Sequence, residues 1–146
     1  MKKLLRWSLV KLPKKIIDAN VLLRFLLADD EDKFRKAKEF VKKLEFGEDE
    51  ALLTEIIFAE IVWVLNKVYS IPREEICSRL LKLLNYKGLK TVFAKEIFSE
   101  SLTCYAASTA DIQDAFLAVL ARHKDCIIIT FDKTDFRKLK VDFKEP

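Results

Sequence analysis

The sequence predicts an α/β fold, a three-layer sandwich in which a central, mainly parallel β-sheet is flanked by helices. Short apolar runs rich in β-branched residues alternate along the chain with longer segments whose apolar residues recur at helical spacing. Regular alternation of a strand with two helices is typical of parallel sheets, because helices form the crossovers between neighbouring strands. The 146 residues suit a single domain, since 51% are hydrophobic and can form one core.

Four apolar segments are predicted to be strands, at residues 14–17, 51–53, 90–93 and 126–130. A short edge strand is predicted around residues 141–143. The fourth segment reads Cys-Ile-Ile-Ile-Thr, and such a continuous apolar run is typical of a strand that is buried on both faces.

Helical spacing predicts two helices in each interval between the first four strands. Gly47 is predicted to end the second helix, Thr54 to cap the third, and Pro72 lies in the first turn of the fourth. The sixth opens at Ser108, and Asp111 three residues later fits an acidic variant of a capping box. The predicted helices cover residues 21–27, 34–44, 56–65, 71–84, 95–107 and 108–121.

Charge is unevenly distributed along the chain. The net charge is +4, but residues 1–15 hold six lysines or arginines and no acid, so the remainder is slightly acidic. Nucleic-acid binding must therefore depend on local placement of basic residues rather than on a basic surface over the whole fold. Residues 1–13 are predicted to be a basic extension, and residues 14–146 the domain itself.

The composition also indicates the cellular compartment in which the protein is expected. No stretch approaches the ~20 apolar residues of a membrane span, and the apolar residues at the start are interrupted by charges, unlike a signal peptide. The three cysteines are an odd number without paired spacing, which predicts no disulfide framework and favours the reducing cytoplasm.

Two aspartates directly follow predicted strands. Asp18 comes after the first strand and Asp132 after the fourth. The crevice outside the carboxyl ends of strands is where open α/β sheets bind ligands, so both are candidate site residues. Each also has a structural interpretation, since Asp18 fits the N-cap of the next helix and Asp132 fits a turn.

Two further acids lie in predicted helices. Glu60 is the only charged residue in residues 56–65 and is predicted to lie on the most buried face, where a lone carboxylate needs a partner, a proton or a metal ion. Alternatively, Glu60 lies at the edge of that face and reaches water or Lys67. Asp114 is too deep in its helix to act as a cap and begins an alanine-rich packing face, so it needs another explanation.

Taken in order, these segments resemble the PIN-domain nucleases, and among them the toxin ribonucleases of VapBC-type toxin–antitoxin pairs. The resemblance spans about residues 14–143. It rests on Ile-Asp-Ala-Asn-Val-Leu at residues 17–22, on Thr54 with residues 59–65, on residues 111–118, and on Ile-Thr-Phe-Asp at residues 129–132.

The resemblance implies an acidic quartet, Asp18, Glu60, Asp114 and Asp132, that is catalytic and holds one or two Mg²⁺ or Mn²⁺ ions while RNA phosphodiester bonds are hydrolysed. Carboxylate oxygens suit these hard ions, whereas one histidine and scattered cysteines argue against zinc. The implied supporting residues are Asp111, Asn20, Thr54 and Thr130. Candidate contacts to the RNA backbone, chosen because they flank the motifs, are Lys15, Arg24, Lys133 and Arg137.

The resemblance further implies a small antitoxin protein that obstructs the pocket, and a homodimer. Two alternatives stay open at this point. One is a PIN nuclease engaged in RNA maturation, and the other is a module of the same fold that binds RNA or a protein without cleaving anything.

Overall fold

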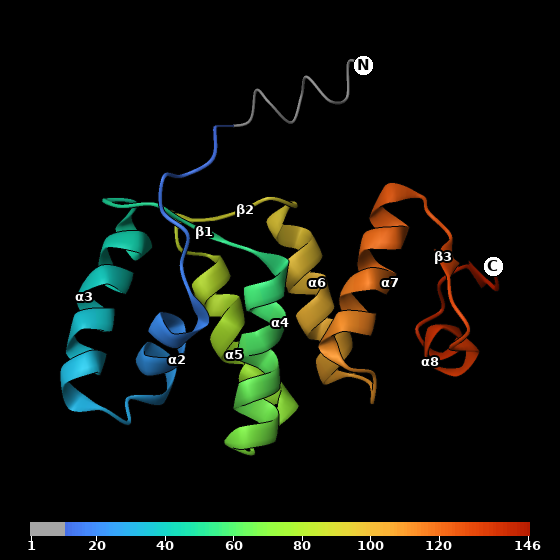
Figure 1. Cartoon of the computed structure of the whole chain (residues 1–146), viewed down its shortest axis with the longest axis horizontal. Coiled ribbons are helices and arrows are strands. Elements are labelled where there is room, and N and C mark those ends of the chain that lie inside the picture. The colour runs from blue at the N-terminus through green and yellow to red at the C-terminus, as the bar shows by residue number, and fades with distance from the viewer. Residues whose placement is uncertain (1–10) are drawn as a thin grey trace.

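The computed structural model describes residues 11–146, in which helices surround short parallel strands (Figure 1). Strand β1 (Ala51–Leu53) pairs in parallel with β2 (Leu89–Thr91), with Leu52 opposite Lys90. The segment before the first helix joins this sheet through a single bridge between Ile16 and Leu52. The predicted strand at residues 14–17 is therefore reduced to one bridged position on the outer side of β1.

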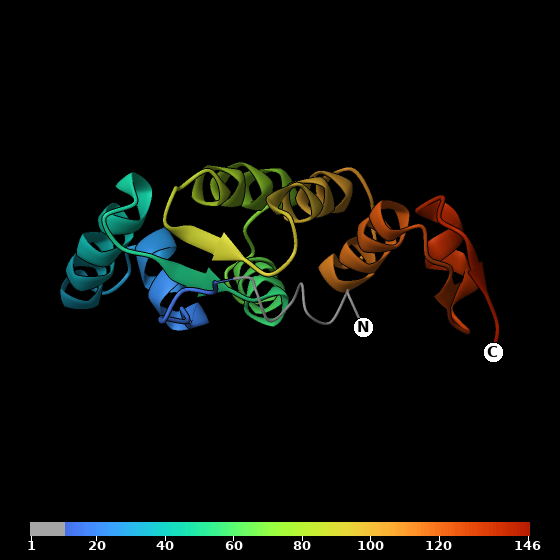
Figure 2. The ribbon, with the colours of Figure 1, turned by 90° about the horizontal axis from the view of Figure 1, so that it is seen from above.

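A second parallel pair lies apart from the first. Strand β3 (Ile128–Ile129) pairs with β4 (Phe143–Lys144). Both views place helix α7 (Ile112–Lys124) between this pair and the sheet of β1 and β2 (Figures 1 and 2). Parallel pairing and the α/β class are thus confirmed, whereas the described strands form two separate sheets.

The prediction that residues 126–130 form a buried strand is wrong for most of its positions. Ile127 and Ile129 are 56% and 54% exposed. A continuous apolar run indicates cover on both faces, but within residues 11–146 β3 pairs with β4 alone.

The helices follow the predicted order, and several of their ends agree with local signals. Thr54 caps α4 by accepting a hydrogen bond from the Ile57 amide at 3.3 Å, and Gly47 ends α3 in the left-handed region at φ 75°. The sixth predicted helix begins later than Ser108, because Asp111 is its N-cap. The remaining bounds are α2 (Ala19–Leu27), α3 (Glu31–Phe46), α4 (Glu55–Trp63), a π-helical segment η1 (Val64–Val68), α5 (Arg73–Leu84), α6 (Lys95–Ala106) and α8 (Lys133–Lys138). No helix within residues 11–146 combines the length and apolar character that crossing a membrane requires.

Helix α7 belongs to two hydrophobic cores. Its Phe116 packs edge-to-face on Phe98 with 5.2 Å between ring centroids, and lies 6.4 Å from the ring of Phe58 on α4, within the main core. Its Ala118 belongs to a smaller core with Phe136 and the adjoining Leu139. The position of α7 is consequently fixed on one side by the main body and on the other by the C-terminal segment.

Arg73, the first residue of α5, holds the turn that leads into α7. Its guanidinium lies over the Tyr105 ring, 4.1 Å from the centroid. Nη1 donates to the carbonyl oxygens of Tyr105, Ser108 and Ala110, at 3.0, 3.2 and 2.6 Å, and Nη2 donates to that of Thr109 at 3.4 Å. Arg73 thereby satisfies four carbonyl groups in the segment between α6 and α7.

Replacing Arg73 with Met is expected to lower the free energy of unfolding by about 1–2 kcal/mol, because charge-assisted hydrogen bonds and a cation–π contact are lost together. Urea unfolding followed by circular dichroism measures this loss. The matched control is Arg35→Met, since the Arg35 ion pair with Asp32 is exposed, and should change stability by no more than ~0.5 kcal/mol. Equal effects of the two substitutions would contradict the structural role of Arg73.

Candidate metal centre

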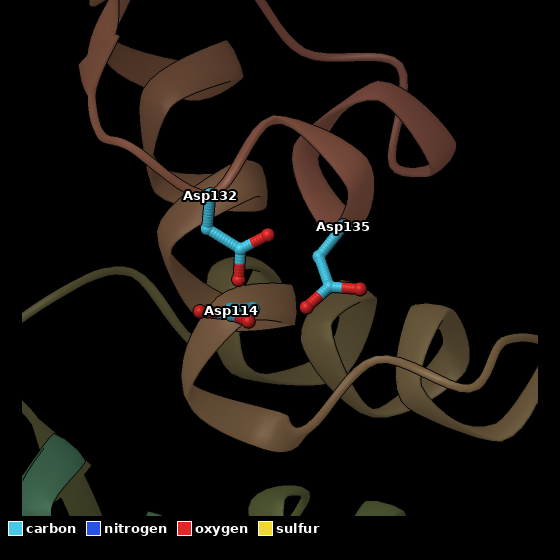
Figure 3. A group of neighbouring side chains, drawn as sticks. All are labelled: Asp114, Asp132 and Asp135. Carbon is cyan, nitrogen blue, oxygen red and sulfur yellow. The ribbon is translucent and has the colours of Figure 1, made fainter. Parts of the chain in front are cut away.

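Three aspartates bring their carboxylates together where α7 meets α8. One oxygen from each of Asp114, Asp132 and Asp135 lies within 4.8 Å of the others. Asp114 projects from the first turn of α7, Asp132 from the turn before α8, and Asp135 from the first turn of α8 (Figure 3). The structure therefore brings together Asp114 and Asp132, two of the four residues of the predicted quartet.

Local hydrogen bonds and the small core place these side chains. The Asp132 amide donates to Thr130 Oγ1 at 2.9 Å, which fixes the turn after β3. The carboxylate of Asp111 accepts from the Asp114 amide at 2.9 Å and so begins α7. Phe136, directly after Asp135, is buried in the core that α8 shares with α7, so the start of α8 is held against the start of α7.

The carboxylates repel one another. Partial burial, followed by the charges of Asp111, Asp135 and Asp132, raises the pKa of Asp114 to about 6. The pKa of Asp135 is also raised, first by the charge of Asp132 and then by burial. Such a group is costly to ionise by itself, and a divalent cation relieves the repulsion.

The donor set fits a hard cation. All three residues offer carboxylate oxygens, and the group includes no thiol or imidazole. Mg²⁺ and Mn²⁺ bind through oxygen and retain several waters, so three carboxylates at a partly exposed position are sufficient protein ligands. The residues present are therefore compatible with the predicted ion.

Asp18 does not belong to this group. It is the N-cap of α2, and its Oδ1 accepts from the Ala19 amide at 2.8 Å. The bridge between Ile16 and Leu52 places Asp18 level with Thr54 at the carboxyl end of β1. Asn20, in the first turn of α2, lines a separate hollow with Arg24.

Glu60 also lies outside the group, and the prediction that it faces the core is wrong. Its side chain is exposed, whereas the neighbouring Ile61 and Val62 are buried. Glu60 lines a groove of about 760 Å³ between α4 and α7, and Asp111, the N-cap of α7, lines the same groove. Apolar periodicity located the helix correctly, but α4 is apolar on nearly every side, so the pattern did not identify its buried face.

Three of the four basic residues predicted to contact RNA have acidic partners. Lys15 pairs with Asp49 at 2.5 Å, Arg24 with Asp29 at 2.9 Å, and Lys133 with Glu145 at 2.7 Å. Arg137 is exposed on α8. Because exposed ion pairs contribute little energy, these side chains can exchange a carboxylate for a phosphate, and their role in binding RNA stays a prediction.

Asp135 was not among the predicted site residues. Its signal is the spacing Asp132-Lys-Thr-Asp135 directly after a strand, because side chains three positions apart at the start of a helix point to the same side. An Asp in the first turn of a helix is commonly explained by its favourable interaction with the helix dipole, so Asp135 did not stand out as a site residue.

Asp114→Asn is expected to stabilise the metal-free protein at pH 7.5. The ionised carboxylate is disfavoured in the fold, as its raised pKa shows; after screening by solvent at this half-exposed position, its removal should add about 1 kcal/mol to the free energy of unfolding. Thermal unfolding in EDTA measures the change. Asp142→Asn, an exposed control, should have almost no effect, and a destabilised Asp114→Asn protein would show that the repulsion is not the dominant interaction.

Comparison with known proteins gives one informative result. A search of curated proteins finds no match. The family model of the PIN domain matches residues 15–142, which is nearly the whole of the chain. PIN domains are usually nucleases and generally use divalent metal ions. The match includes the pair of β1 and β2, strand β3, the groove and the three clustered aspartates, and the chain belongs to the PIN-domain family.

Proposed function

We propose that this PIN domain is an endoribonuclease that depends on Mg²⁺ or Mn²⁺ and hydrolyses RNA phosphodiester bonds. The observation that carries the proposal is the convergence of three carboxylates at the junction of α7 and α8, with the pKa of Asp114 raised to about 6. The nuclease character of the family supports it.

Asp114, Asp132 and Asp135 would hold one or two ions, and Asp18 and Glu60 would complete the site. A divalent ion makes water easier to deprotonate and stabilises the negative charge that develops on the phosphate oxygens. The pKa of Asp114 is raised to about 6 in the metal-free chain, so binding of the cation to this carboxylate releases its proton. The Thr130 hydroxyl orients the backbone at Asp132, and Asp111 fixes the start of α7.

The biological role that fits best is a toxin of the VapBC type, in the cytoplasm, with residues 14–146 as the nuclease domain and residues 1–13 as an extension. PIN domains often have antitoxin partners. The groove between α4 and α7 is lined by exposed apolar residues, including Ile56, Trp63 and Leu117, and an apolar antitoxin helix would suit it.

A cleavage assay on single-stranded RNA tests the enzymatic proposal. The protein is purified under conditions that remove bound inhibitors, and its refolding is checked by circular dichroism. Cleavage is expected with Mg²⁺ or Mn²⁺ and should stop when EDTA is added. RNA binding without cleavage in either ion would instead support a non-catalytic binding module.

Induced expression tests the toxin role separately. Growth arrest by the parent chain, but not by Asp114→Asn, is the expected result. Normal growth, together with altered ends on a processed RNA, would favour RNA maturation.

A further inference from the structure

The segment that leads into α7 has few backbone hydrogen bonds of its own. Residues 107–110 join α6 to Asp111, the N-cap of α7, and form neither helix nor strand. Within residues 11–146, no backbone amide donates to the carbonyls of the last three residues of this segment. Carbonyl groups in a partly buried segment need a donor, and the guanidinium of Arg73 donates to all three. The path of the chain into α7 therefore depends on Arg73.

Arg73 is itself held by the main core. It is the first residue of α5, whose Ile76 and Leu80 are buried in that core. Its guanidinium is stacked on the ring of Tyr105, which is buried in the same core. Because a guanidinium is a rigid planar fork, its hydrogen bonds fix the direction as well as the distance of the groups that it contacts. Arg73 thus ties the start of α7 to the main core.

The start of α7 determines where Asp114 lies. Asp111 directly follows the segment that Arg73 holds, and its carbonyl accepts from the Ala115 amide at 3.0 Å. The carboxylate of Asp111 accepts from the Asp114 amide at 2.9 Å. Asp114 is in this first turn, where its carboxylate meets those of the other two clustered aspartates (Figure 3). A shift of the segment before α7 would therefore move Asp114 relative to them.

The same segment also supports α8. The Ala110 carbonyl is the nearest of the four acceptors, 2.6 Å from Arg73 Nη1. Ala110 is buried in the small core together with Phe136 of α8, and Phe136 directly follows Asp135. Arg73 consequently holds a part of the backbone on which both sides of the acidic cluster depend.

We propose that Arg73 is a positioning residue of the metal centre, an inference that rests on the proposed function. Through the carbonyls before α7, Arg73 sets the distance between Asp114 and the two aspartates of the C-terminal segment. The hydrogen bonds of Arg73 in the described chain go to backbone carbonyls within residues 105–110. Arg73 therefore acts on the carboxylates through the backbone, without contact with the ion or the RNA.

The sign of the effect separates positioning from simple electrostatics. Removal of a positive charge from the neighbourhood of acidic side chains would by itself strengthen the binding of a divalent cation. Loss of the guanidinium fork instead lets the first turn of α7 move away from α8, which weakens a site made of three carboxylates. Weaker binding in an Arg73 variant therefore identifies the positioning role.

Mn²⁺ binding at pH 7.5, followed by electron paramagnetic resonance of the free ion, tests the proposal. Arg73→Met should weaken binding by about tenfold, as is found when residues that orient metal ligands are replaced. Arg73→Lys keeps the charge but has a single ammonium in place of the fork, so it should also bind Mn²⁺ more weakly than the parent. Circular dichroism checks that each variant is folded, and the Lys variant carries the test if the Met variant is not.

The matched control is Arg79→Met. Arg79 is on the same helix, and its Nη1 donates to the Leu26 carbonyl at 2.9 Å, so it joins α5 to α2 and not to α7. Its replacement should lower the unfolding temperature but change Mn²⁺ affinity by no more than about twofold, because it shares no partner with the cluster.

Amide hydrogen exchange of the metal-free protein gives a second measurement. The amides of Asp114 and Ala115 are protected by Asp111, and Arg73→Met should make both exchange faster, since the cap is held by the segment before it. Arg79→Met should leave their exchange unchanged. Unchanged exchange at these amides in Arg73→Met would overturn the structural half of the proposal.

The possible failures can be told apart. Parental Mn²⁺ affinity in folded Arg73 variants would overturn the positioning role and leave the metal centre standing. An equal loss of affinity in Arg79→Met would overturn it as well, since general destabilisation would then explain both results. A parent chain that binds no Mn²⁺ would reject the metal centre, and with it both the proposed function and the role of Arg73.

Discussion

Asp114→Asn and Asp132→Asn should each reduce the rate of RNA cleavage by about 10²–10⁴-fold while the fold is retained. Both carboxylates belong to the cluster that would hold the ion, and an amide provides only one neutral oxygen to a cation. For Asp114 the loss of activity should accompany a gain in stability, since the ionised carboxylate is disfavoured in the fold. A residue with a purely structural role would show the opposite, lower stability and little direct effect on chemistry.

Single-turnover cleavage of RNA, with circular dichroism of each variant, measures this effect. Asp142→Asn serves as the control because Asp142 is exposed and lies outside the cluster; its cleavage rate should match that of the parent. Asp135→Asn extends the test to the residue that the sequence did not identify. Parental activity in the Asp114 and Asp132 variants would remove the site assignment.

Local features of this fold could be predicted from the sequence because their causes are local. The hydroxyl of Thr54 caps α4, and Gly47 adopts the left-handed conformation that ends α3. Each depends on one residue and its nearest turn. The alternation of strands and helices predicted parallel pairing in the same way, since helical crossovers leave few other arrangements.

Features that depend on distant contacts were harder to predict. The apolar character of residues 126–130 indicated burial, but Ile127 and Ile129 are more than half exposed in the structure. The apolar composition of a strand indicates that the strand can be buried. Whether another helix or strand covers it depends on how the C-terminal segment attaches to α7.

The candidate site also has a part that the sequence predicted and a part that depends on distant contacts. Asp114 and Asp132 were predicted to meet, and they do, because α7 and α8 share the small core beside them. Asp18 and Glu60 were expected at the same place, but each is positioned by the main body, through β1 and α4 respectively. The sequence identifies carboxylates at the ends of helices and strands. How the main body and the C-terminal segment are joined depends on packing between residues far apart in the chain.

Binding of Mn²⁺ to the cluster should weaken about tenfold between pH 7.5 and pH 5. Asp114 has a pKa of about 6 and must lose its proton before it can bind an ion as a carboxylate, so protons compete with the metal over this range. The raised pKa of Asp135 acts in the same direction. Titration of the protein with Mn²⁺ at the two pH values, followed by electron paramagnetic resonance of the free ion, measures the change.

In the metal-free protein, protonation of Asp114 has the opposite effect, because it stabilises the folded state. Because the pKa of Asp114 is higher in the folded chain than its ordinary value of 3.8, the folded state binds the proton more tightly between about pH 4 and pH 6. Relative to Asp114→Asn, the parent should therefore lose stability as pH rises through that window, and saturating Mn²⁺ should reverse the difference at pH 7.5. Thermal unfolding of both proteins with and without Mn²⁺ provides the comparison, and a difference that does not change with pH would show that Asp114 is not the group linking protons to the metal.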